Sequence, residues 1–508
     1  MISRRTILGA GSAATAYSVL QAGPVLAGGT RSATSSPPWD QLRRRLTGDL
    51  ILPSDASYAT AKQLDTVEYD KVDPSGVVYC ETTGDVAASL RFAQDNCLPF
   101  AARSGGHSGG GYSTSRGLVI DVSRLNGITL GDGTVKVGTG TQNVDILNAL
   151  APSGLAVVGG ACPTVAAGGF IQGGGIGFLT PSFGIACDNV TSAQVVLASG
   201  RTVTASAQEH SDLFWALRGG GGGNFGIVTS YTVTPDPLTT VATANLSFTW
   251  DRAVDMLHGY AQWLTDAPRT IGGGGIITLP DAAPGGVPVP VVQLVSTGTS
   301  AELESEVARL LSLTGPAASR SANVLPYVNL MMGVYGCATR TVSQCHRVGA
   351  TPEGQLPRPL FGLERSRFFG GAPARSAWER IVAVFDADRL AGQTHQLQVL
   401  PTGGAAGDLS RTATAYVHRD SLFTLNFLST IRQGTVTDEA RAVAHAWVDR
   451  GFATGDPYSN GETYQNFIDP ALPDWRASYY AENYSRLVAV KRRYDPYNAF
   501  SFAQSVGA

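Results

Sequence analysis

Between residues 70 and 237, the hydrophobic and polar positions alternate or cluster over short stretches that are typical of β-strands. Such runs, each bounded by glycine or proline, predict strands at 98–103, 117–123, 134–140 and 225–235. A further stretch, 193–205, predicts a β-hairpin that turns at Ser199–Gly200.

Two segments of the same region instead repeat their apolar positions at helical spacing. Residues 85–96 predict an amphipathic helix with Asp85 as its N-cap, and residues 144–154 predict a helix closed by Gly154. Strands and short helices therefore alternate here, and we predict a first α+β domain over 70–237.

The pattern changes after residue 238. Strand-like runs at 287–295 and 423–428 alternate with helical stretches, which lie at 300–313, 376–387 and 436–450. This alternation of strand-like and helical stretches predicts a second domain, 238–460, built on an antiparallel sheet covered by helices. Residues 461–508 form an aromatic-rich C-terminal segment.

Composition narrows the class of protein. The chain has 508 residues, of which 43% are hydrophobic and 15% charged, as in a soluble globular protein of two or three domains or one bilobal unit. The net charge is −3 and no basic block occurs, so we expect no nucleic-acid partner and no membrane partner after export. We predict no metal site.

The N-terminus predicts export. Arg4 and Arg5 precede a weakly apolar stretch that ends in a small-residue cleavage pattern at Ala27, so residues 1–27 are predicted to be a twin-arginine signal peptide. The alternative is a chance arginine pair on an ordinary secretory signal. The twin-arginine route carries folded proteins, so we expect a bacterial protein, secreted or periplasmic, that binds its cofactor first and meets the export machinery transiently.

Four of the six cysteines are assigned structural roles here. Export permits disulfides, and Cys337 and Cys345 flank a short loop and can pair. Cys80 and Cys187 end or follow apolar runs and are most simply buried thiols.

Three glycine clusters carry the first chemical signal. They lie at 105–111, 168–178 and 218–226, each between predicted strands. Clustered glycines let backbone N–H groups converge around an anion such as a pyrophosphate. The third cluster alone has the alternative of a flexible loop, but three together predict one extended, phosphate-bearing cofactor. No convincing dinucleotide-binding fingerprint or P-loop is present.

Four motifs carry a resemblance to a known family. They read "RSGGHSGGGYS" (103–113), "GACPTVAAGGFIQGGGIGFLTPSFGIACDNV" (160–190), "WALRGGGGGNFGIVT" (215–229) and "YYAENYSRLVAVKRRYDPYNAF" (479–500). In this order they resemble the berberine-bridge-enzyme-like FAD-linked oxidases, from about residue 60 to 506. The resemblance implies an α+β, bilobal fold: a PCMH-type FAD-binding domain, a substrate domain, and a C-terminal segment that returns to the FAD domain.

The resemblance also implies two covalent links to the flavin. His107 matches the histidine that bonds the 8α-methyl carbon, and Cys162 matches the cysteine that bonds C6. Imidazole and thiolate are suitable nucleophiles near neutral pH. The other positions predicted to contact FAD are Arg103, Ser104, Gly105, Gly106, Ser108, Gly168, Gly169, Gly173, Gly174, Gly177, Asp188, Gly226, Val228, Asn483 and Tyr484.

The implied reaction is oxidation of a C–OH group on a sugar, an oligosaccharide or a glycosylated natural product. Val165, three positions after the cysteine, implies O₂ as electron acceptor and hydrogen peroxide as product. The alternatives are a ring-closing or desaturating oxidase of a secondary metabolite, and a flavin-retaining protein without the usual base.

The last alternative comes from one departure. Family members carry a basic tyrosine in Y-x-N-Y-x-D, but "TYQNFIDP" places Phe467 at that position. Candidate replacements are Tyr464, Tyr416 and Asp469, with Tyr112 a weaker one. If this segment is extended, Asp469 shares a face with Phe467 and Tyr464 points away. His418 and Arg419 are expected to belong to the scaffold.

Overall fold

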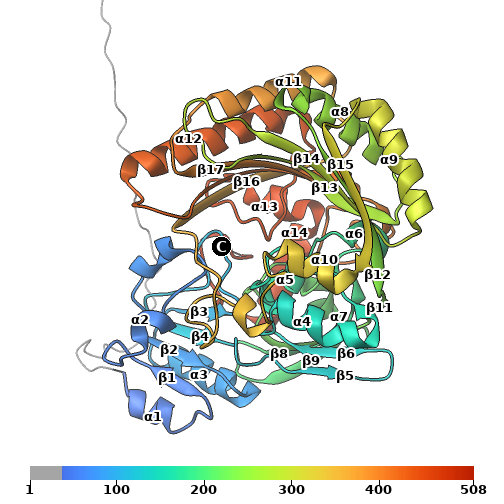
Figure 1. Cartoon of the computed structure of the whole chain (residues 1–508). Coiled ribbons are helices and arrows are strands. Elements are labelled where there is room, and N and C mark those ends of the chain that lie inside the picture. The colour runs from blue at the N-terminus through green and yellow to red at the C-terminus, as the bar shows by residue number, and fades with distance from the viewer. Residues whose placement is uncertain (1–36, 508) are drawn as a thin grey trace, which may run out of the picture. The chain divides into compact units, whose positions relative to one another are not determined.

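The structure is a computed structural model that describes residues 37–507, and Figure 1 shows how its elements are arranged. The predicted signal peptide lies outside the described residues. From Asp40 onward, the described residues belong to one compact unit. Short helices α1 and α2 come first, at Trp39–Arg43 and Tyr58–Ala61.

A four-stranded sheet forms the N-terminal part of the fold, in the order β1-β2-β4-β3. Its strands are β1 (Asp49–Ile51), β2 (Gly76–Tyr79), β3 (Phe100–Arg103) and β4 (Leu118–Asp121). Strands β2, β4 and β3 are parallel, which requires crossover connections. Helix α3 (Thr83–Asp95) is the crossover from β2 to β3.

The predicted N-cap of α3 is wrong by three positions. Thr82 is the N-cap: its hydroxyl accepts the Asp85 N–H at 3.1 Å, and the Asp85 carboxylate accepts the Thr82 N–H at 3.0 Å. This reciprocal pair satisfies two N–H groups that the first helical turn leaves unpaired. The same carboxylate also accepts the backbone N–H groups of Thr47 and Gly48, and so anchors the preceding segment.

A five-stranded antiparallel sheet follows, in the order β5-β6-β10-β8-β9. Its strands are β5 (Ile128–Leu130), β6 (Val135–Gly138), β8 (Val190–Val196), β9 (Thr202–Ser206) and β10 (Ile227–Val233). The hairpin predicted at 193–205 is the β8–β9 pair. Helices of this part are α4 (Asn143–Leu150), α5 (Ala167–Gln172), α6 (Thr180–Phe183) and α7 (Ser211–Ala216). Short strands β7 (Leu155–Ala156) and β11 (Asp236–Pro237) pair with each other.

The largest sheet has seven antiparallel strands in the order β15-β12-β14-β13-β17-β18-β16. Their bounds are β12 (Thr240–Ser247), β13 (Ile271–Leu279), β14 (Val289–Ser296), β15 (Ser319–Pro326), β16 (Phe361–Phe369), β17 (Gln393–Pro401) and β18 (Phe423–Ile431). This sheet, together with the two smaller sheets and the helices described above, confirms the predicted α+β fold.

Helices cover the outer face of this sheet (Figure 1). They are α8 (Ala253–Leu264), α9 (Ser300–Thr314), α11 (Arg375–Ala383) and α12 (Asp438–Gly455). A buried core that includes Trp263, Trp378 and Trp447 joins these helices to the sheet. Because one face is sealed in this way, side chains on the opposite face are free to line a site.

The C-terminal segment packs against the first half of the chain. Helices α13 (Trp475–Tyr480) and α14 (Tyr484–Tyr494) lie in this segment, and α14 packs on α7. The buried Lys491 ammonium donates to the Asn224 carbonyl at 2.8 Å and to the Asp495 carboxylate at 2.7 Å. Asn224 lies in the third glycine cluster, so α14 fixes the conformation of that loop.

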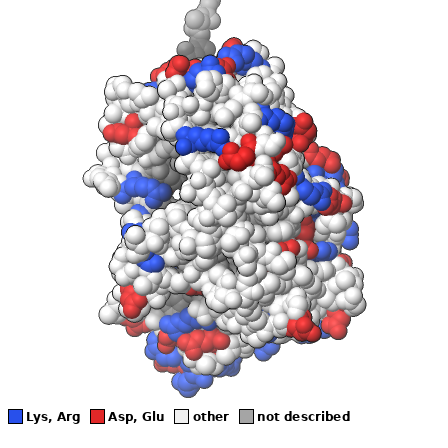
Figure 2. Space-filling view, turned by 45° about the vertical axis from the view of Figure 1, so that its right-hand side comes forward, with Lys and Arg blue, Asp and Glu red and all other residues white. Residues whose placement is uncertain are grey.

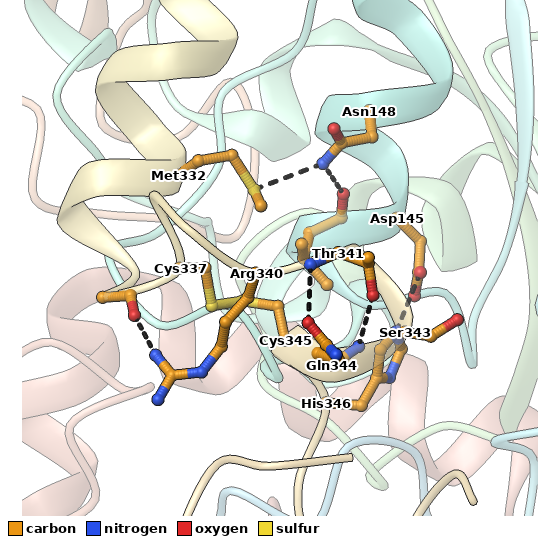
Figure 3. The surroundings of a disulfide bond; sticks show 12 residues. Asp145, Asn148, Met332, Cys337, Arg340, Thr341, Ser343, Gln344, Cys345 and His346 are labelled. Atoms are coloured by element: carbon orange, nitrogen blue, oxygen red, sulfur yellow. Dashed lines mark hydrogen bonds and ion pairs between the residues drawn. A yellow bond between two sulfur atoms is a disulfide. The ribbon is translucent and has the colours of Figure 1, made fainter. Parts of the chain in front are cut away.

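A disulfide joins Cys337 and Cys345, and Figure 3 shows its surroundings. The loop that it closes follows α10 (Tyr327–Val334). His346 Nε2 lies 3.0 Å from the Asp145 carboxylate of α4, so the linked loop is tied to α4. Cys80 and Cys187 are buried, as predicted.

Charges do not gather by sign on the face shown in Figure 2, where Lys and Arg are interspersed with Asp and Glu. Across residues 37–507, no helix has the length and apolar character needed to span a bilayer. Within the same residues, no group of three or more His, Cys, Asp and Glu side chains is placed to hold a metal ion.

Candidate active site

A cavity with a volume of about 1360 Å³ lies between the glycine clusters and the inner face of the seven-stranded sheet. All three clusters contribute backbone to its wall. The sheet contributes side chains from several strands, and residues 464–468 contribute one further wall. Small-molecule sites usually have volumes of about 300–1,000 Å³. The cavity therefore has room for an extended cofactor and a substrate together.

His107 and Cys162 lie on the wall of this cavity. The ring nitrogen His107 Nε2 lies 2.8 Å from Thr164 Oγ1 and 3.5 Å from Asp65 Oδ1. Because Thr164 follows Cys162 by two residues, this contact brings the cysteine loop beside the histidine. Two residues that are 55 positions apart in the sequence thus share one region of the cavity.

The environment of Cys162 disfavours the thiolate. The side chain is accessible from the cavity, but protein surrounds the cavity. This burial raises the pKa of the thiol from 9.0 to about 11, with smaller contributions from the carboxylates of Asp65 and Glu364. The contribution of Glu364 indicates that its carboxylate and the Cys162 sulfur are close enough to interact electrostatically.

The second and third glycine clusters form a cradle without side chains. A Cβ added at Gly169 meets no protein atom within 4 Å, and one added at Gly222 meets only the Gly169 Cα, at 3.6 Å. Both glycines line the cavity, so side chains there would occupy cavity space. This arrangement fits the phosphate-bearing part of FAD, which backbone N–H groups can approach closely.

Most of the predicted cofactor-binding residues line the cavity. They are Arg103, Ser104, Gly105, Gly106, His107, Ser108, Cys162, Gly168, Gly169, Gly177, Gly226 and Val228. The remaining five do not line it: Gly173, Gly174, Asp188, Asn483 and Tyr484.

Gly173 and Gly174 allow close packing of other side chains. A Cβ at Gly173 would lie 1.9 Å from Asn466 Oδ1, and one at Gly174 would lie 2.8 Å from the Tyr416 ring. Asn483 donates its side-chain amide to backbone carbonyls, the nearest being that of Arg411 at 2.8 Å. These residues therefore support the walls of the cavity.

Asp188 forms a buried ion pair with Arg419. Both guanidinium Nη atoms lie 2.7 Å from its carboxylate oxygens, and only 1% of the Arg419 side chain is exposed. The pair joins the end of the second glycine motif to the segment before β18. This placement agrees with the expected scaffold role of Arg419.

The segment that carries Phe467 forms a turn rather than an extended strand. The Phe467 N–H donates to the Tyr464 carbonyl at 2.9 Å, and the two rings meet edge to face at 5.0 Å. Both side chains consequently line the cavity. The expectation that Tyr464 points away depended on an extended backbone, which this turn replaces.

The Tyr464 hydroxyl already accepts three hydrogen bonds. The donors are the backbone N–H groups of Gly175 at 2.7 Å and Ile176 at 3.3 Å, and the Asn466 side-chain amide at 2.8 Å. Burial raises the pKa of Tyr464 despite these contacts. These donors favour the phenolate, but burial outweighs them, so the hydroxyl keeps its proton near neutral pH and does not act as a base.

Tyr416 and Asp469 are not among the residues that line the cavity. Tyr416 is fully buried, and burial raises its pKa. Asp469 is 1% exposed and accepts a hydrogen bond from Arg365 Nε at 2.8 Å. Both remain predicted catalytic candidates, but this geometry does not favour either.

Gln465 is held by a buried chain of polar groups. His418 Nδ1 lies 2.8 Å from Glu462 Oε2, and His418 Nε2 lies 3.0 Å from Gln465 Oε1. Gln465 lines the cavity, whereas His418 is fully buried beneath it. His418 thus positions a cavity-facing amide, consistent with its expected scaffold role.

The acidic residue of the cavity was not predicted from the sequence. Glu364 on β16 is the only acidic residue among those that line the cavity within residues 37–507. Burial raises the pKa of its carboxyl from 4.5 to about 8. The sequence offered one indication. Alternate residues of a strand share a face, so Glu364 lies on the same face of β16 as Phe368, four positions further along.

A cavity with a glycine cradle, a histidine and a cysteine on one wall, and a sheet opposite them defines a flavin-dependent enzyme. Family models agree: residues 74–206 match an FAD binding domain, and residues 463–507 match the berberine and berberine-like domain. The chain belongs to the berberine-bridge-enzyme-like FAD-linked oxidoreductases.

One relative is similar over most of the chain, and a second over less than half of it. The chain is 28% identical to an uncharacterized FAD-linked oxidoreductase, YgaK of Bacillus subtilis, over 91% of this chain and 98% of that protein. It is 38% identical to (R)-6-hydroxynicotine oxidase of Paenarthrobacter nicotinovorans, over 44% of this chain and 48% of the oxidase.

Solved structures show the same fold at lower identity. The berberine-bridge-enzyme-like protein 1 of Physcomitrella patens superposes with a TM-score of 0.81 at 23% identity, covering 92% of this chain and 98% of the other. A chitooligosaccharide oxidase superposes with a TM-score of 0.79 at 22% identity, with the same coverage.

Proposed function

We propose that the chain is an FAD-dependent oxidase that oxidises a C–OH group of a sugar, an oligosaccharide or a glycosylated natural product. His107 and Cys162 would hold the flavin covalently, and O₂ would be the electron acceptor. The observation that carries this proposal is one cavity with both nucleophiles on one wall and, on the other, a largely apolar sheet that carries Gln293, Gln398 and Glu364.

The support for two covalent links is the proximity of the two side chains. Thr164 contacts His107 directly and lies two residues from Cys162. The glycine cradle leaves open space at Gly169, where an added Cβ would meet no protein atom within 4 Å. Because the Cys162 pKa is about 11, its thiol must lose a proton for the second bond to form. The histidine link does not carry this requirement, so we expect it to form more readily.

The support for a hydroxylated substrate is the set of amide side chains that faces the cavity. Gln293 and Gln398 line the cavity from the sheet, and Asn329 lines it from α10. No hydrogen bond links the Gln293 or Asn329 side chain to another described residue. An amide both donates and accepts, which suits the hydroxyl groups of a sugar. Apolar neighbours such as Ile276 and Leu400 provide surface for the carbon skeleton.

Each part of the chain has a separate task in the proposed reaction. Bound FAD supplies a two-electron acceptor for hydride, and O₂ then reoxidises it with release of hydrogen peroxide. The amides orient the substrate, and the sheet with the 464–468 wall limits access of water. Val165 lines the cavity, where its small side chain leaves space for O₂.

Peroxide release tests the proposal. The purified holoenzyme is mixed with a panel of sugars, oligosaccharides and simple alcohols, and both hydrogen peroxide and the bleaching of flavin absorbance are recorded. We expect bleaching without air and peroxide with air. A Val165→Leu variant should keep the bleaching but reoxidise more slowly. A flavin that no panel member bleaches would contradict the proposed reaction.

We also propose export through the twin-arginine route, on the basis of Arg4 and Arg5 alone. Replacing both with lysine should keep the protein in the cytoplasm, as fractionation of the producing cells would show. Continued export of the variant would favour an ordinary secretory signal.

A further inference from the structure

The proposed oxidation needs a group that takes the hydroxyl proton. Phe467 cannot ionise, and burial raises the pKa of the Tyr464 hydroxyl, which therefore keeps its proton near neutral pH. Asp469 is paired with Arg365 outside the cavity lining. The proton acceptor must therefore be another residue of the cavity.

Glu364 faces the cavity from the inner side of β16. Phe368 lies four positions further along β16 and therefore on the same face as Glu364. Its ring stacks on that of His418 beneath the sheet, with the ring centroids 4.4 Å apart. Leu363 lies on the opposite face of β16 and packs into the helix-covered core. Side chains of a strand alternate between its two faces, so Glu364 must point away from the helices, and it lines the cavity.

The carboxylate of Glu364 has no protein partner among the described residues. In contrast, its neighbours Arg365 and Arg367 each bind carboxylates, those of Asp469 and Asp456 respectively. A buried carboxyl usually requires a hydrogen-bonding or charged partner. An unpaired one that faces a ligand cavity is therefore available to a group that enters the cavity.

The groups around Glu364 do not neutralise it. The residue opposite Glu364 on the paired strand β18 is Leu428, and the residue opposite Leu428 on the next strand, β17, is Gln396; neither titrates. The titratable groups that line the facing walls are Cys97, His107, Tyr112, Cys162 and Tyr464, and Arg103 is already paired with Asp121. Two charged groups near Cys162, Asp65 and Arg432, act on its thiol in opposite senses. Glu364 and Cys162 line the same cavity, which places the carboxylate in the space that the predicted flavin attachment point also faces.

We propose that Glu364 is the residue that takes the hydroxyl proton of the substrate. The O–H bond breaks, and its proton goes to a carboxylate oxygen of Glu364. The adjacent C–H bond breaks with loss of hydride to the FAD, and a carbonyl forms. Glu364 then releases the proton to solvent. This inference rests on the proposed function, because it assigns the base for that reaction.

The chemistry of the site suits this task. A general base works best when its pKa is near the operating pH, and burial brings the Glu364 carboxyl to a pKa of about 8. Burial in an apolar site without a charged partner is an established way to tune a carboxyl for proton transfer.

The first test needs no substrate. The flavin absorbance of the resting holoenzyme is titrated from pH 6 to 10 in wild type, in Glu364→Gln and in Glu353→Gln. Glu353 is exposed and has no charged partner among the described residues, which makes it a matched control. We expect a spectral transition near pH 8 in wild type and the control only. A transition that persists in Glu364→Gln, or is absent from wild type, would overturn the placement of Glu364 beside the flavin.

The second test measures flavin reduction by a substrate under anaerobic conditions as a function of pH. Glu364→Gln should lower the rate by about 10²–10⁴-fold, remove the rise of the rate through pH 8, and leave the substrate Kd within about threefold. Glu364→Asp keeps the charge and should recover part of the rate. It also provides the decisive comparison if the glutamine variant folds poorly.

Two results of this second test would overturn the proposal. One is a reduction rate within tenfold of wild type with the same pH profile. The other is weaker substrate binding with an unchanged limiting rate, which would make Glu364 a binding residue only. Failure of the proposed function looks different: no panel substrate bleaches the flavin, while the titration near pH 8 still depends on Glu364.

Discussion

The pH dependence of stability offers a separate view of Glu364. The pKa of its carboxyl is about 8 in the folded protein, and the ordinary value of 4.5 applies in the unfolded chain. Below pH 4.5 the group is protonated in both the folded and the unfolded state, so it has no effect. As the pH rises to 8, the unfolded chain loses this proton while the folded chain keeps it, so folding becomes progressively less favourable.

The structure also bounds the magnitude. One pKa unit corresponds to about 1.4 kcal/mol, so the difference between 4.5 and about 8 sets an upper limit of about 5 kcal/mol above pH 8. The carboxyl is only partly shielded from the cavity, and water there lowers the cost, so we expect about 2–4 kcal/mol. For a chain of this length that corresponds to about 2–4 °C in Tm.

Thermal unfolding of the holoenzyme can measure this effect. Glu364→Gln should have the Tm of wild type at pH 4.5, and its Tm should exceed that of wild type increasingly up to pH 8, with no further gain at pH 9. Glu353→Gln should follow wild type throughout. A constant difference between Glu364→Gln and wild type at all pH values would refute the argument, because it would indicate a packing effect rather than a buried charge.

Three further predictions follow from the fold. Cys337→Ser opens a short loop and should lower the unfolding free energy by about 2–3 kcal/mol, with no loss under reducing conditions; an equal loss there would point to packing. Asp188→Asn leaves the Arg419 charge buried and should cost about 3–5 kcal/mol in denaturant unfolding, whereas a loss below 1 kcal/mol would contradict the buried pair. Phe467→Tyr should change the rate of flavin reduction by less than about threefold, since Glu364 already takes the proton; a large gain would indicate that Phe467 marks a lost base.

Local periodicity predicted the elements of the fold well, because each depends on residues near in sequence. The β8–β9 hairpin, the helix closed by Gly154 and the helix-covered antiparallel sheet were all identified in this way. The N-cap of α3 was wrong because Asp85 fills the third helical position and Thr82 the cap. Both residue types are common caps, and only the backbone geometry separates them.

The candidate site was predictable where backbone alone defines it, as in the glycine clusters. It was not predictable where distant partners decide the role of a side chain. Asp469 is occupied by Arg365, which is 104 residues away in the sequence. Glu364 lies in the charged stretch "LERSR", and the sequence does not show that both arginines there find carboxylates while the glutamate finds none.

The central claim is that one cavity holds FAD through His107 and Cys162. The most direct measurement is the intact mass of the acid-denatured chain, for wild type, His107→Ala, Cys162→Ala and the double variant. We predict that wild type and each single variant carry the mass of one FAD and that the double variant carries none. A wild-type chain that loses its flavin on denaturation would contradict the claim.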